Sequence, residues 1–292
     1  MNLVIMGLKK RYRSNIALNG INMEIHPGIH GLLGSNGAGK TTLLRILATI
    51  LRSDSGEIHW GETLDWKRPT AVKKALGYLP QQFGMYPYLS VREALRCVAL
   101  LKGLPQQRER EQIDLALERT HLADFQARKV AHLSGGMLRR LGIAQAILGE
   151  PDLLLLDEPS VGLDPEERIH LRKIIREYAS SSRIVLLSSH IVGDIESLCD
   201  SLTILCGGNV LFSGGTQEAT LLADGWVREA AVEKSALDDW ERRYTVVNFL
   251  PGESSYTVRY LDREKRATGE TVPTLEDSYA LLVRAYKERE RL

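Results

Sequence analysis

The residues best suited to chemistry lie in a short glycine-rich stretch. Residues 34–42 read GSNGAGKTT, which fits the pattern G-x-x-x-x-G-K-[ST]. Glycines let successive backbone N–H groups surround an anion without a Cβ clash. In this pattern the lysine reaches the β- and γ-phosphates of a nucleotide, and the next hydroxyl is offered to Mg²⁺. The pattern therefore predicts a nucleotide site made of Gly34, Ser35, Asn36, Gly37, Ala38, Gly39, Lys40, Thr41 and Thr42.

Two acidic residues follow an apolar run later in the chain. Leu153 to Leu156 are four consecutive leucines, and Asp157 and Glu158 come directly after them. Such a run is typical of a strand buried in a parallel sheet, and ligands bind at the carboxyl ends of these strands. We expect Asp157 to hold Mg²⁺ through water and Glu158 to orient the water that attacks the γ-phosphate. An isolated acidic pair could instead be the charged start of a helix, but the glycine-rich stretch favours the catalytic interpretation.

A third motif separates this chain from other phosphate-loop proteins. Residues 133–137, here called the signature segment, read LSGGM. Ser134 and the glycine N–H groups at a helix start form a second anion site. Together with the phosphate loop and the acidic pair, this segment resembles the ATP-binding-cassette (ABC) family, whose usual pattern is L-S-G-G-Q. Met137 departs from that pattern. The resemblance implies that Ser134, Gly135 and Gly136 act on ATP held by a partner subunit.

The resemblance also gives roles to further positions. Gln81, in GYLPQ, resembles the glutamine that contacts Mg²⁺ and water, with the adjacent Gln82 as an alternative. His190 resembles the histidine that contacts the γ-phosphate. Tyr12 resembles the aromatic residue that stacks on adenine, although a surface tyrosine near basic residues would look the same. Asp164 ends the SVGLD segment, which resembles the loop that crosses the dimer interface.

The elements that must position these residues alternate between strands and helices, which predicts an α/β fold with a parallel sheet. Short runs in residues 1–30 predict strands. The resemblance refines the fold to a P-loop ABC ATPase domain with a mixed core sheet, an N-terminal antiparallel β subdomain and a helical subdomain at about 83–150. The patterns predict helices over about 41–51, 106–120, 165–180 and 191–199, and another that follows the glycine pair at 135–136 and runs to about 149. They predict apolar strands over 29–33, 153–156 and 184–187.

The segment after Gln81 combines aromatic residues, a methionine and a proline. Residues 83–89 read FGMYPYL. Aromatic residues and Met are enriched at interfaces, and in transport members of the family this region lies beside the groove for a helix of the membrane subunit. The alternative is a packing segment inside the helical subdomain. Ser90 and Glu93 form a capping box that starts a helix directly afterwards.

The character of the chain changes after about Gly215. We expect an ABC nucleotide-binding domain over residues 1–218 and a small α+β accessory domain over residues 219–292, with strands near 244–249 and 256–262 and a final helix from Leu275. Dimer contact, regulation and stabilisation all remain open as roles for the accessory domain.

The net charge, the cysteine content and the length of the apolar runs argue against some classes of protein. The 292 residues carry a formal net charge of +1, whereas nucleic-acid binders usually show a basic excess. The sparse cysteines Cys97, Cys199 and Cys206 are typical of a reduced, cytoplasmic chain. No stretch reaches the roughly 18 apolar residues of a membrane span. A chain of this kind that works at a membrane needs another chain to supply the spans, and the ABC resemblance implies a peripheral protein on the inner face of the cell membrane.

The wording of the motifs looks most like bacterial exporters of the drug- or sodium-extrusion type, in which ATPase and membrane subunits are separate chains. This resemblance implies an ATP- and Mg²⁺-dependent ATPase that drives a separate transmembrane permease. One set of motifs supplies half of each complete site, so hydrolysis requires a second ABC subunit, either a second copy in a homodimer or a close relative.

Two other classes of protein fit less well. ABC proteins that act on ribosomes or DNA usually carry tandem cassettes, long coiled coils or zinc sites, and none of these patterns occurs in the sequence. A P-loop kinase or GTPase would not explain the signature segment, and a GTPase would need the absent N-K-x-D. No nucleic-acid partner is expected.

Overall fold

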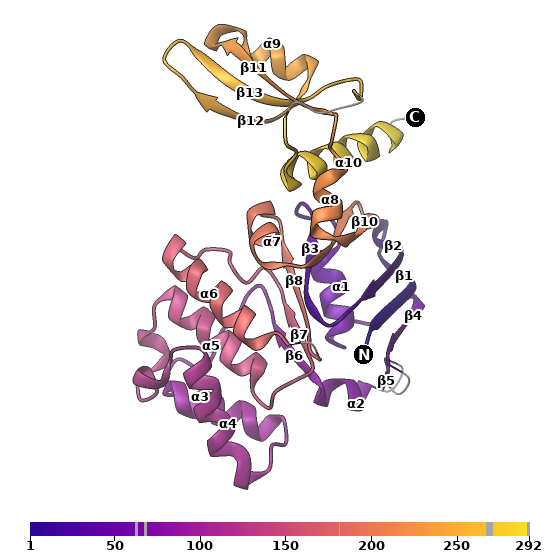
Figure 1. The fold of residues 1–292 in the computed structure, drawn as a ribbon. Helices are drawn as coiled ribbons and strands as arrows, with labels where there is room; N and C mark the ends of the chain where they lie inside the picture. Colours follow the sequence, from indigo (N-terminus) through magenta and orange to yellow (C-terminus); the bar gives the residue numbers. More distant parts are fainter. Residues whose placement is uncertain (62–63, 67–68, 181, 267–270, 291–292) are drawn as a thin grey trace. The chain divides into compact units, whose positions relative to one another are not determined.

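The computed structural model describes residues 1–61, 64–66, 69–180, 182–266 and 271–290. The chain forms two compact units, Met1–Val210 and Leu211–Leu292 (Figure 1). The two units divide after Val210, eight residues before the domain boundary predicted after residue 218. That boundary stays a prediction. Within the described residues, no helix is long and apolar enough to cross a membrane.

An antiparallel sheet begins the first unit, as the family resemblance predicted. Its strand order is β2-β1-β4-β5. Leu3 and Ile5 on β1 are buried, whereas the next residue, Met6, is exposed, because side chains along a strand point to alternate faces. Leu8 is buried as well, because the pairing register of β1 shifts between Ile5 and Leu8. The strands are β1 (Leu3–Tyr12), β2 (Asn15–Ile25), β4 (Ser55–Trp60) and β5 (Leu64–Asp65).

The central sheet has the strand order β10-β9-β3-β8-β7-β6. β3 pairs in parallel with β8 and β9, and β7 pairs in parallel with β6 and β8. Every residue of β7 and β8 is buried, as expected for strands covered on both faces. The carboxyl ends of β3, β8 and β7 therefore lie side by side. The strands are β3 (Gly28–Leu33), β6 (Leu76–Leu79), β7 (Leu153–Leu156), β8 (Ile184–Ser189), β9 (Ser201–Cys206) and β10 (Asn209–Gly215).

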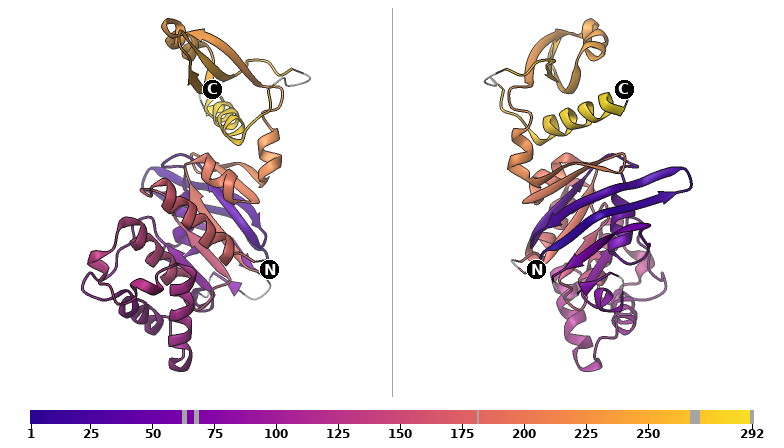
Figure 2. Two further views of the ribbon diagram at one scale, coloured as in Figure 1. Left: turned by 60° about the vertical axis from the view of Figure 1, so that its left-hand side comes forward. Right: turned by 90° about the vertical axis from the view of Figure 1, so that its right-hand side faces the viewer.

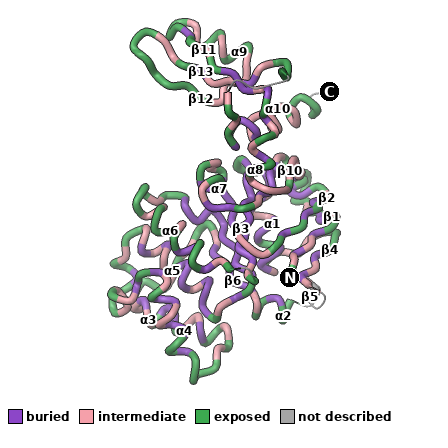
Figure 3. Tube along the Cα trace, in the orientation of Figure 1, coloured by how far each residue is buried: buried purple, intermediate pink, exposed green. Residues whose placement is uncertain are grey.

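Helix α1 (Lys40–Leu47) lies between the two sheets. Leu43, Leu44 and Leu47 share one core cluster with side chains of β1 and of the central strands, including Ile5 and Leu155. In Figure 3 the buried residues follow this core along central strands such as β3. The phosphate loop is thus fixed at both ends, by a buried strand and by a buried helix.

The prediction that the first helix extends to Leu51 is wrong. The helix ends at Leu47, and Thr49 adopts a left-handed φ of 58°. The backbone N–H groups of Ile50 and Leu51 both donate to the carbonyl of Arg45, which closes a turn in place of a further helical turn. Apolar residues continue at helical spacing to Ile50, but Ile50 is 65% exposed, so the spacing does not show where the backbone leaves the helix.

Helices α3 to α5 form the helical subdomain. Figures 1 and 2 show them gathered away from the antiparallel strands. The capping box is confirmed, because Ser90 accepts the backbone N–H of Glu93 and the Glu93 side chain accepts that of Ser90. The remaining helices of the unit are α2 and α6 to α7. The bounds are α2 (Pro69–Lys74), α3 (Val91–Leu101), α4 (Gln106–Arg119), α5 (Gly135–Ile147), α6 (Pro165–Tyr178) and α7 (Val192–Leu198).

The second unit is a small α+β body with an antiparallel sheet of order β11-β13-β12. Its core contains Ala223, Val227 and Leu261. Asp277 at the start of α10 is buried and accepts hydrogen bonds from the guanidinium of Arg259, which ties the helix to β13. The sequence reasoning missed β11. The elements are α8 (Thr216–Leu221), β11 (Val227–Glu233), α9 (Leu237–Arg243), β12 (Thr245–Pro251), β13 (Ser255–Leu261) and α10 (Leu275–Glu290).

Candidate nucleotide site

The phosphate loop connects β3 to α1, and two of its glycines are required by its geometry. Gly39 has a φ of 107°, and a Cβ there would lie 2.6 Å from the carbonyl oxygen of Ala17. A Cβ on Gly34 would lie 2.5 Å from the carbonyl oxygen of Leu205. Since contacts this short do not occur, any larger residue at either position would displace the loop. The glycines hold the backbone close to its neighbours and leave the N–H groups free of side-chain cover.

Lys40 is buried, with 4% of its surface exposed. Its Nζ donates to the carbonyl oxygens of Gly34 at 2.7 Å and Ser35 at 3.1 Å, and lies 3.4 Å from Oε1 of Glu158. Burial lowers the pKa of Lys40, and the neighbouring Glu158 carboxylate opposes that shift. The ammonium group is therefore held against the loop, where it can meet the phosphates of a nucleotide.

Asp157 lies at the end of β7 and is fully buried. Its Oδ1 accepts hydrogen bonds from the hydroxyls of Thr41 at 3.1 Å and Ser188 at 2.8 Å. Its Oδ2 is buried and has no hydrogen-bond partner among the described residues. Burial raises the pKa of Asp157, with the hydrogen bonds from Ser188 and Thr41 opposing it. An unpaired carboxylate oxygen beside a threonine hydroxyl fits Mg²⁺, a hard cation that takes oxygen ligands.

Glu158 is the point on which the predicted catalytic residues converge. Gln81 Nε2 donates to its Oε2 at 3.1 Å, and Nδ1 of His190 lies 3.3 Å from the same oxygen. With Lys40 on Oε1, three side chains from three different segments contact one buried carboxylate. Gln81, the favoured of the two adjacent glutamines, is the one that makes this contact.

Ser188 is a site residue that the sequence reasoning missed. It is fully buried near the end of β8, and its Oγ accepts the backbone N–H of Glu158 at 2.9 Å. The same hydroxyl donates to Asp157, so it fixes both acidic residues. The available signal was two serines closing an otherwise apolar strand beside His190, since polar side chains at a buried strand end must find a partner.

A hollow of about 340 Å³ lies at the phosphate loop, with Lys40 and Glu158 in its lining. Tyr12 at the end of β1, 43% exposed, lines it from the antiparallel sheet. Gln81 and Glu158 line it from the central sheet, and the phosphate loop forms the wall between them. An aromatic ring, the phosphate loop and a buried carboxylate thus share one cavity. The lining residues are Tyr12, Asn15, Ala17, Asn36, Gly37, Gly39, Lys40, Thr41, Thr42, Gln81 and Glu158.

Comparison with known proteins shows to which family the chain belongs. Residues 18–161 match the family model described as ABC transporter. The chain is 36% identical over 217 residues to the daunorubicin resistance ATP-binding protein DrrA3 of Streptomyces coeruleorubidus, covering 74% of this chain and 69% of the relative. The chain belongs to the ABC transporter ATP-binding proteins.

Further relatives agree with this assignment. The Nod factor export ATP-binding protein I of Cupriavidus metallidurans is 34% identical, with 74% of this chain and 72% of the relative covered. Among solved structures, cbiO1 of Clostridium perfringens, part of the ABC transporter complex cbiONQ, is similar with a TM-score of 0.67 and 28% identity, covering 74% of this chain and 89% of that chain. The protein is thus an ATP-binding subunit of an ABC transporter with the P-loop ABC fold.

The signature segment of this ABC subunit lies outside the hollow. Ser134 caps α5 by accepting the backbone N–H of Met137 at 3.1 Å, and both Ser134 and Gly135 are exposed. Met137 is buried, so the departure from the family's usual glutamine places an apolar side chain in the protein interior. Asp164 likewise caps α6, accepting the N–H of Glu167 at 2.9 Å, and does not line the hollow. The structure therefore brings the phosphate loop, Gln81, the acidic pair and His190 together, and leaves the signature segment and Asp164 apart.

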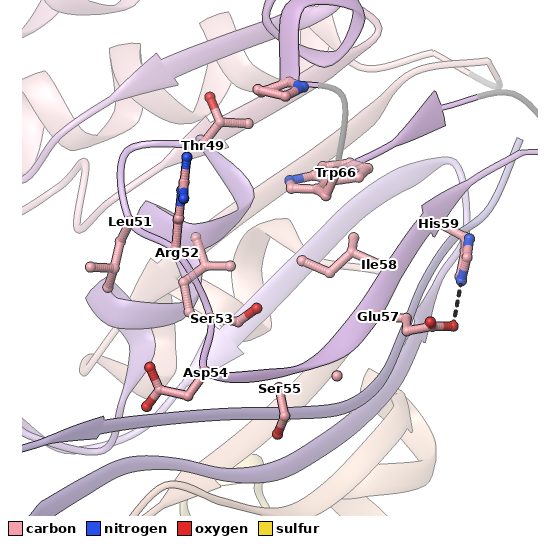
Figure 4. A pocket seen from close by; sticks show the side chains of 13 residues that line it. Thr49, Leu51, Arg52, Ser53, Asp54, Ser55, Glu57, Ile58, His59 and Trp66 are labelled. Atoms are coloured by element: carbon pink, nitrogen blue, oxygen red, sulfur yellow. Dashed lines mark hydrogen bonds and ion pairs between the residues drawn. The ribbon is translucent and has the colours of Figure 1, made fainter.

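A second hollow, of about 510 Å³, lies at the other end of α1, where the chain turns into β4 (Figure 4). Thr49, Arg52, Ile58 and Trp66 are among its lining residues, and Glu57 and His59 pair at its edge. None of the predicted site residues lines this hollow. The hollow at the phosphate loop is instead lined by several of them, namely Tyr12, Asn36, Gly37, Gly39, Lys40, Thr41, Thr42, Gln81 and Glu158.

Proposed function

We propose that this chain hydrolyses ATP with Mg²⁺ and drives a separate transmembrane permease. The observation that carries the proposal is the convergence of Lys40, Gln81 and His190 on the buried carboxylate of Glu158, beside the phosphate loop. A carboxylate with no partner other than Lys40 would serve as a structural ion pair. The added amide and imidazole instead surround Glu158 with groups that can hold a water and a γ-phosphate.

Each residue of the site has a separate proposed task. Glu158 accepts a proton from the attacking water, Gln81 and His190 hold that water and the γ-phosphate in line, and Lys40 neutralises phosphate charge. Thr41 and Asp157, with Gln81, would hold Mg²⁺, which would act as a Lewis acid and offset the negative charge of the phosphates. Tyr12 would stack on the base. These contacts act mainly by positioning and electrostatics, which is how phosphoryl transfer is generally catalysed.

The complete site is proposed to form between two subunits. Ser134 and Gly135 are exposed at the N-terminus of α5, a helix end that favours anions, yet they do not line their own subunit's hollow. A second copy arranged head to tail would place this helix end over the γ-phosphate, with Asp164 in the loop between subunits. The γ-phosphate then makes contacts in the closed dimer that the open state lacks, and hydrolysis removes them.

An ATP-induced change of mass tests this arrangement. A Glu158→Gln chain should be monomeric without nucleotide and shift to twice the mass with Mg²⁺-ATP, measured by size-exclusion chromatography with light scattering. Adding Ser134→Arg should block this change of mass, because the arginine side chain fills the space of the partner's γ-phosphate. Fluorescent ATP should still bind to the double variant. A monomer under all conditions, or a dimer insensitive to Ser134→Arg, would contradict the shared site.

The proposed permease partner makes this chain a peripheral protein on the inner face of a bacterial membrane, with no nucleic-acid partner. Export is favoured because one relative is a daunorubicin resistance protein and another is a Nod factor export protein. Residues 1–218 are proposed to form the ABC domain and residues 219–292 an accessory domain. The neighbouring reading frame offers an independent check, since a multi-spanning membrane protein there would support transport.

The segment at residues 83–89 is the proposed contact with the permease. Its side chains divide into two groups: Phe83 is half-buried and lies close to Gly142 of α5, whereas Tyr86 and Tyr88 are exposed, Tyr86 by 70%. Phe83 therefore packs inside the helical subdomain, as the alternative interpretation of this segment expects, whereas the two tyrosines remain available to a partner. Exposed aromatic side chains of this kind are frequent anchors at protein interfaces.

Replacing Tyr86 with alanine should leave the basal ATPase rate of the isolated chain within about twofold, since the ring makes no contact with the nucleotide hollow. The same change should reduce stimulation of the ATPase by the co-expressed membrane subunit roughly tenfold, as expected for an interface anchor. Ile169→Ala, at another exposed apolar side chain on α6, is the control. Equal loss of basal and stimulated rates would place Tyr86 in folding or catalysis instead.

A further inference from the structure

Arg139 lies on α5, beyond the signature segment, and is buried, with 9% of its surface exposed. Its guanidinium donates five hydrogen bonds, all to backbone carbonyl oxygens. Nε donates to Pro159 at 2.8 Å, Nη1 to Pro80 at 3.2 Å and Gln81 at 3.1 Å, and Nη2 to Asp157 at 2.9 Å and Glu158 at 2.6 Å.

The five acceptors belong to the two loops that carry the catalytic side chains. One loop follows β6 and contains Gln81, and the other follows β7 and contains Asp157 and Glu158. A guanidinium has five N–H donors in a fixed planar fork, so the fork of Arg139 is fully used in holding these loops. Burial lowers the pKa of Arg139, opposed by the nearby charges of Asp157 and Glu158. Its hydrogen bonds nevertheless go to backbone rather than to a carboxylate, which distinguishes it from an ordinary buried ion pair.

The backbone of Glu158 needs such support. Glu158 adopts a φ of 47°, a left-handed conformation that side chains other than glycine rarely adopt. Its N–H donates to Ser188 and its carbonyl accepts from Arg139, so the strained residue is clamped on both sides. Strained conformations persist only where the surroundings enforce them. If the Arg139 clamp is lost, Glu158 can relax and its carboxylate leaves the position shared with Gln81 and His190.

We propose that Arg139 is a positioning residue that couples the two half-sites carried by one subunit. The same rigid helix holds Ser134 at its start, directed to the partner's ATP, and Arg139 further along, bound to the loops of its own site. Closure of the signature segment over the partner's nucleotide is thereby transmitted to Gln81 and Glu158. This inference rests on the proposed function, because it assumes that Glu158 is the hydrolytic carboxylate and that the site is shared.

The coupling role makes a prediction that a purely structural role does not. In Arg139→Gln the phosphate loop and Tyr12 are untouched, so the dissociation constant for ATP should change by no more than about threefold. The kcat should fall roughly 10²-fold, the size expected when a catalytic group moves by about 1 Å. Arg139→Lys, which keeps the charge but can reach fewer carbonyls, should give an intermediate kcat with the same ATP affinity.

The experiment compares purified Arg139→Gln, Arg139→Lys and Arg183→Gln by phosphate release, fluorescent-ATP binding and thermal unfolding. Arg183 is the matched control, because its half-buried guanidinium also bonds a backbone carbonyl and a carboxylate, but those of Tyr178 and Glu150, away from the site. The Arg183 variant should lose thermal stability without a selective loss of kcat. A selective loss of kcat at unchanged affinity in the Arg139 variants supports the proposal.

Two results would overturn it: wild-type kcat in Arg139→Lys and Arg139→Gln, or a fall in kcat matched by equal falls in ATP affinity and stability, as for a packing residue. Should Arg139→Gln not fold, the split between kcat and affinity in Arg139→Lys decides. Glu158→Gln, assayed in parallel, tests the proposed function separately from the coupling role of Arg139. If Glu158→Gln retains hydrolysis, the proposed function fails, whereas if only the Arg139 variants are normal, the coupling role alone fails.

Discussion

Replacing Glu158 with glutamine should nearly stop ATP hydrolysis while leaving ATP binding intact. Glutamine keeps the size of the side chain and can still contact Gln81, but it cannot take a proton from water. Loss of a general base typically costs roughly 10²- to 10⁴-fold in rate. ATP affinity should change little, because the phosphate loop and Tyr12 are unaltered. Phosphate release measures the rate, and fluorescent ATP measures the affinity.

A matched acidic residue provides the control for this experiment. Glu166 is exposed in the first turn of α6 and has no place in the nucleotide hollow. Glu166→Gln removes one negative charge from the same subunit, so it should leave hydrolysis unchanged within about twofold. Hydrolysis by Glu158→Gln at the wild-type rate would refute the assignment of Glu158. Hydrolysis lost together with ATP binding would show that Glu158 supports the site structurally through Lys40.

The parts of the site that sequence reasoning could predict are those encoded by neighbouring residues. The phosphate loop and the acidic pair each form one continuous motif, and each follows a buried strand, so both position and chemistry can be inferred locally. Met137 illustrates the same logic: its side chain is buried, whereas Ser134 and Gly135 of the same segment are exposed. A substitution at the interior position leaves the exposed positions intact.

The parts that sequence reasoning missed depend on tertiary neighbours. Ser188 reads as an ordinary polar strand end until β8 is placed beside β7, where its hydroxyl meets both Asp157 and Glu158. In the sequence, Arg139 is simply one of two adjacent arginines on a predicted helix. Its role cannot be inferred there, because its five acceptors lie in loops that are far from it in the sequence. Arg139 bonds backbone carbonyls, and Ser188 bonds the backbone N–H of Glu158 and the side chain of Asp157. Motif spacing carries no information about such contacts.

Replacing Lys40 with alanine should weaken ATP binding, the second large effect. The change removes charge-assisted hydrogen bonds to phosphate, worth about 1.5–3 kcal/mol, or roughly 10- to 10²-fold in affinity. It also leaves Glu158 without its cation in a buried site, next to an incoming polyanion. Lys173→Ala, at an exposed lysine on α6, removes the same charge elsewhere and should bind ATP normally. Wild-type affinity in Lys40→Ala would contradict the phosphate-loop assignment.

A double variant separates the two causes of this loss. If unmasked repulsion from Glu158 contributes, then Lys40→Ala combined with Glu158→Gln should bind ATP more tightly than Lys40→Ala alone. The difference is an interaction energy between the two positions, which contacting residues show and distant ones do not. No recovery of affinity would mean that the lost lysine contact accounts for the whole effect. Because Lys40 and Glu158 lie 3.4 Å apart in a buried site, we expect a measurable recovery of affinity. In this view the lysine has two tasks, because it binds phosphate and also offsets the negative charge of the catalytic carboxylate next to that phosphate.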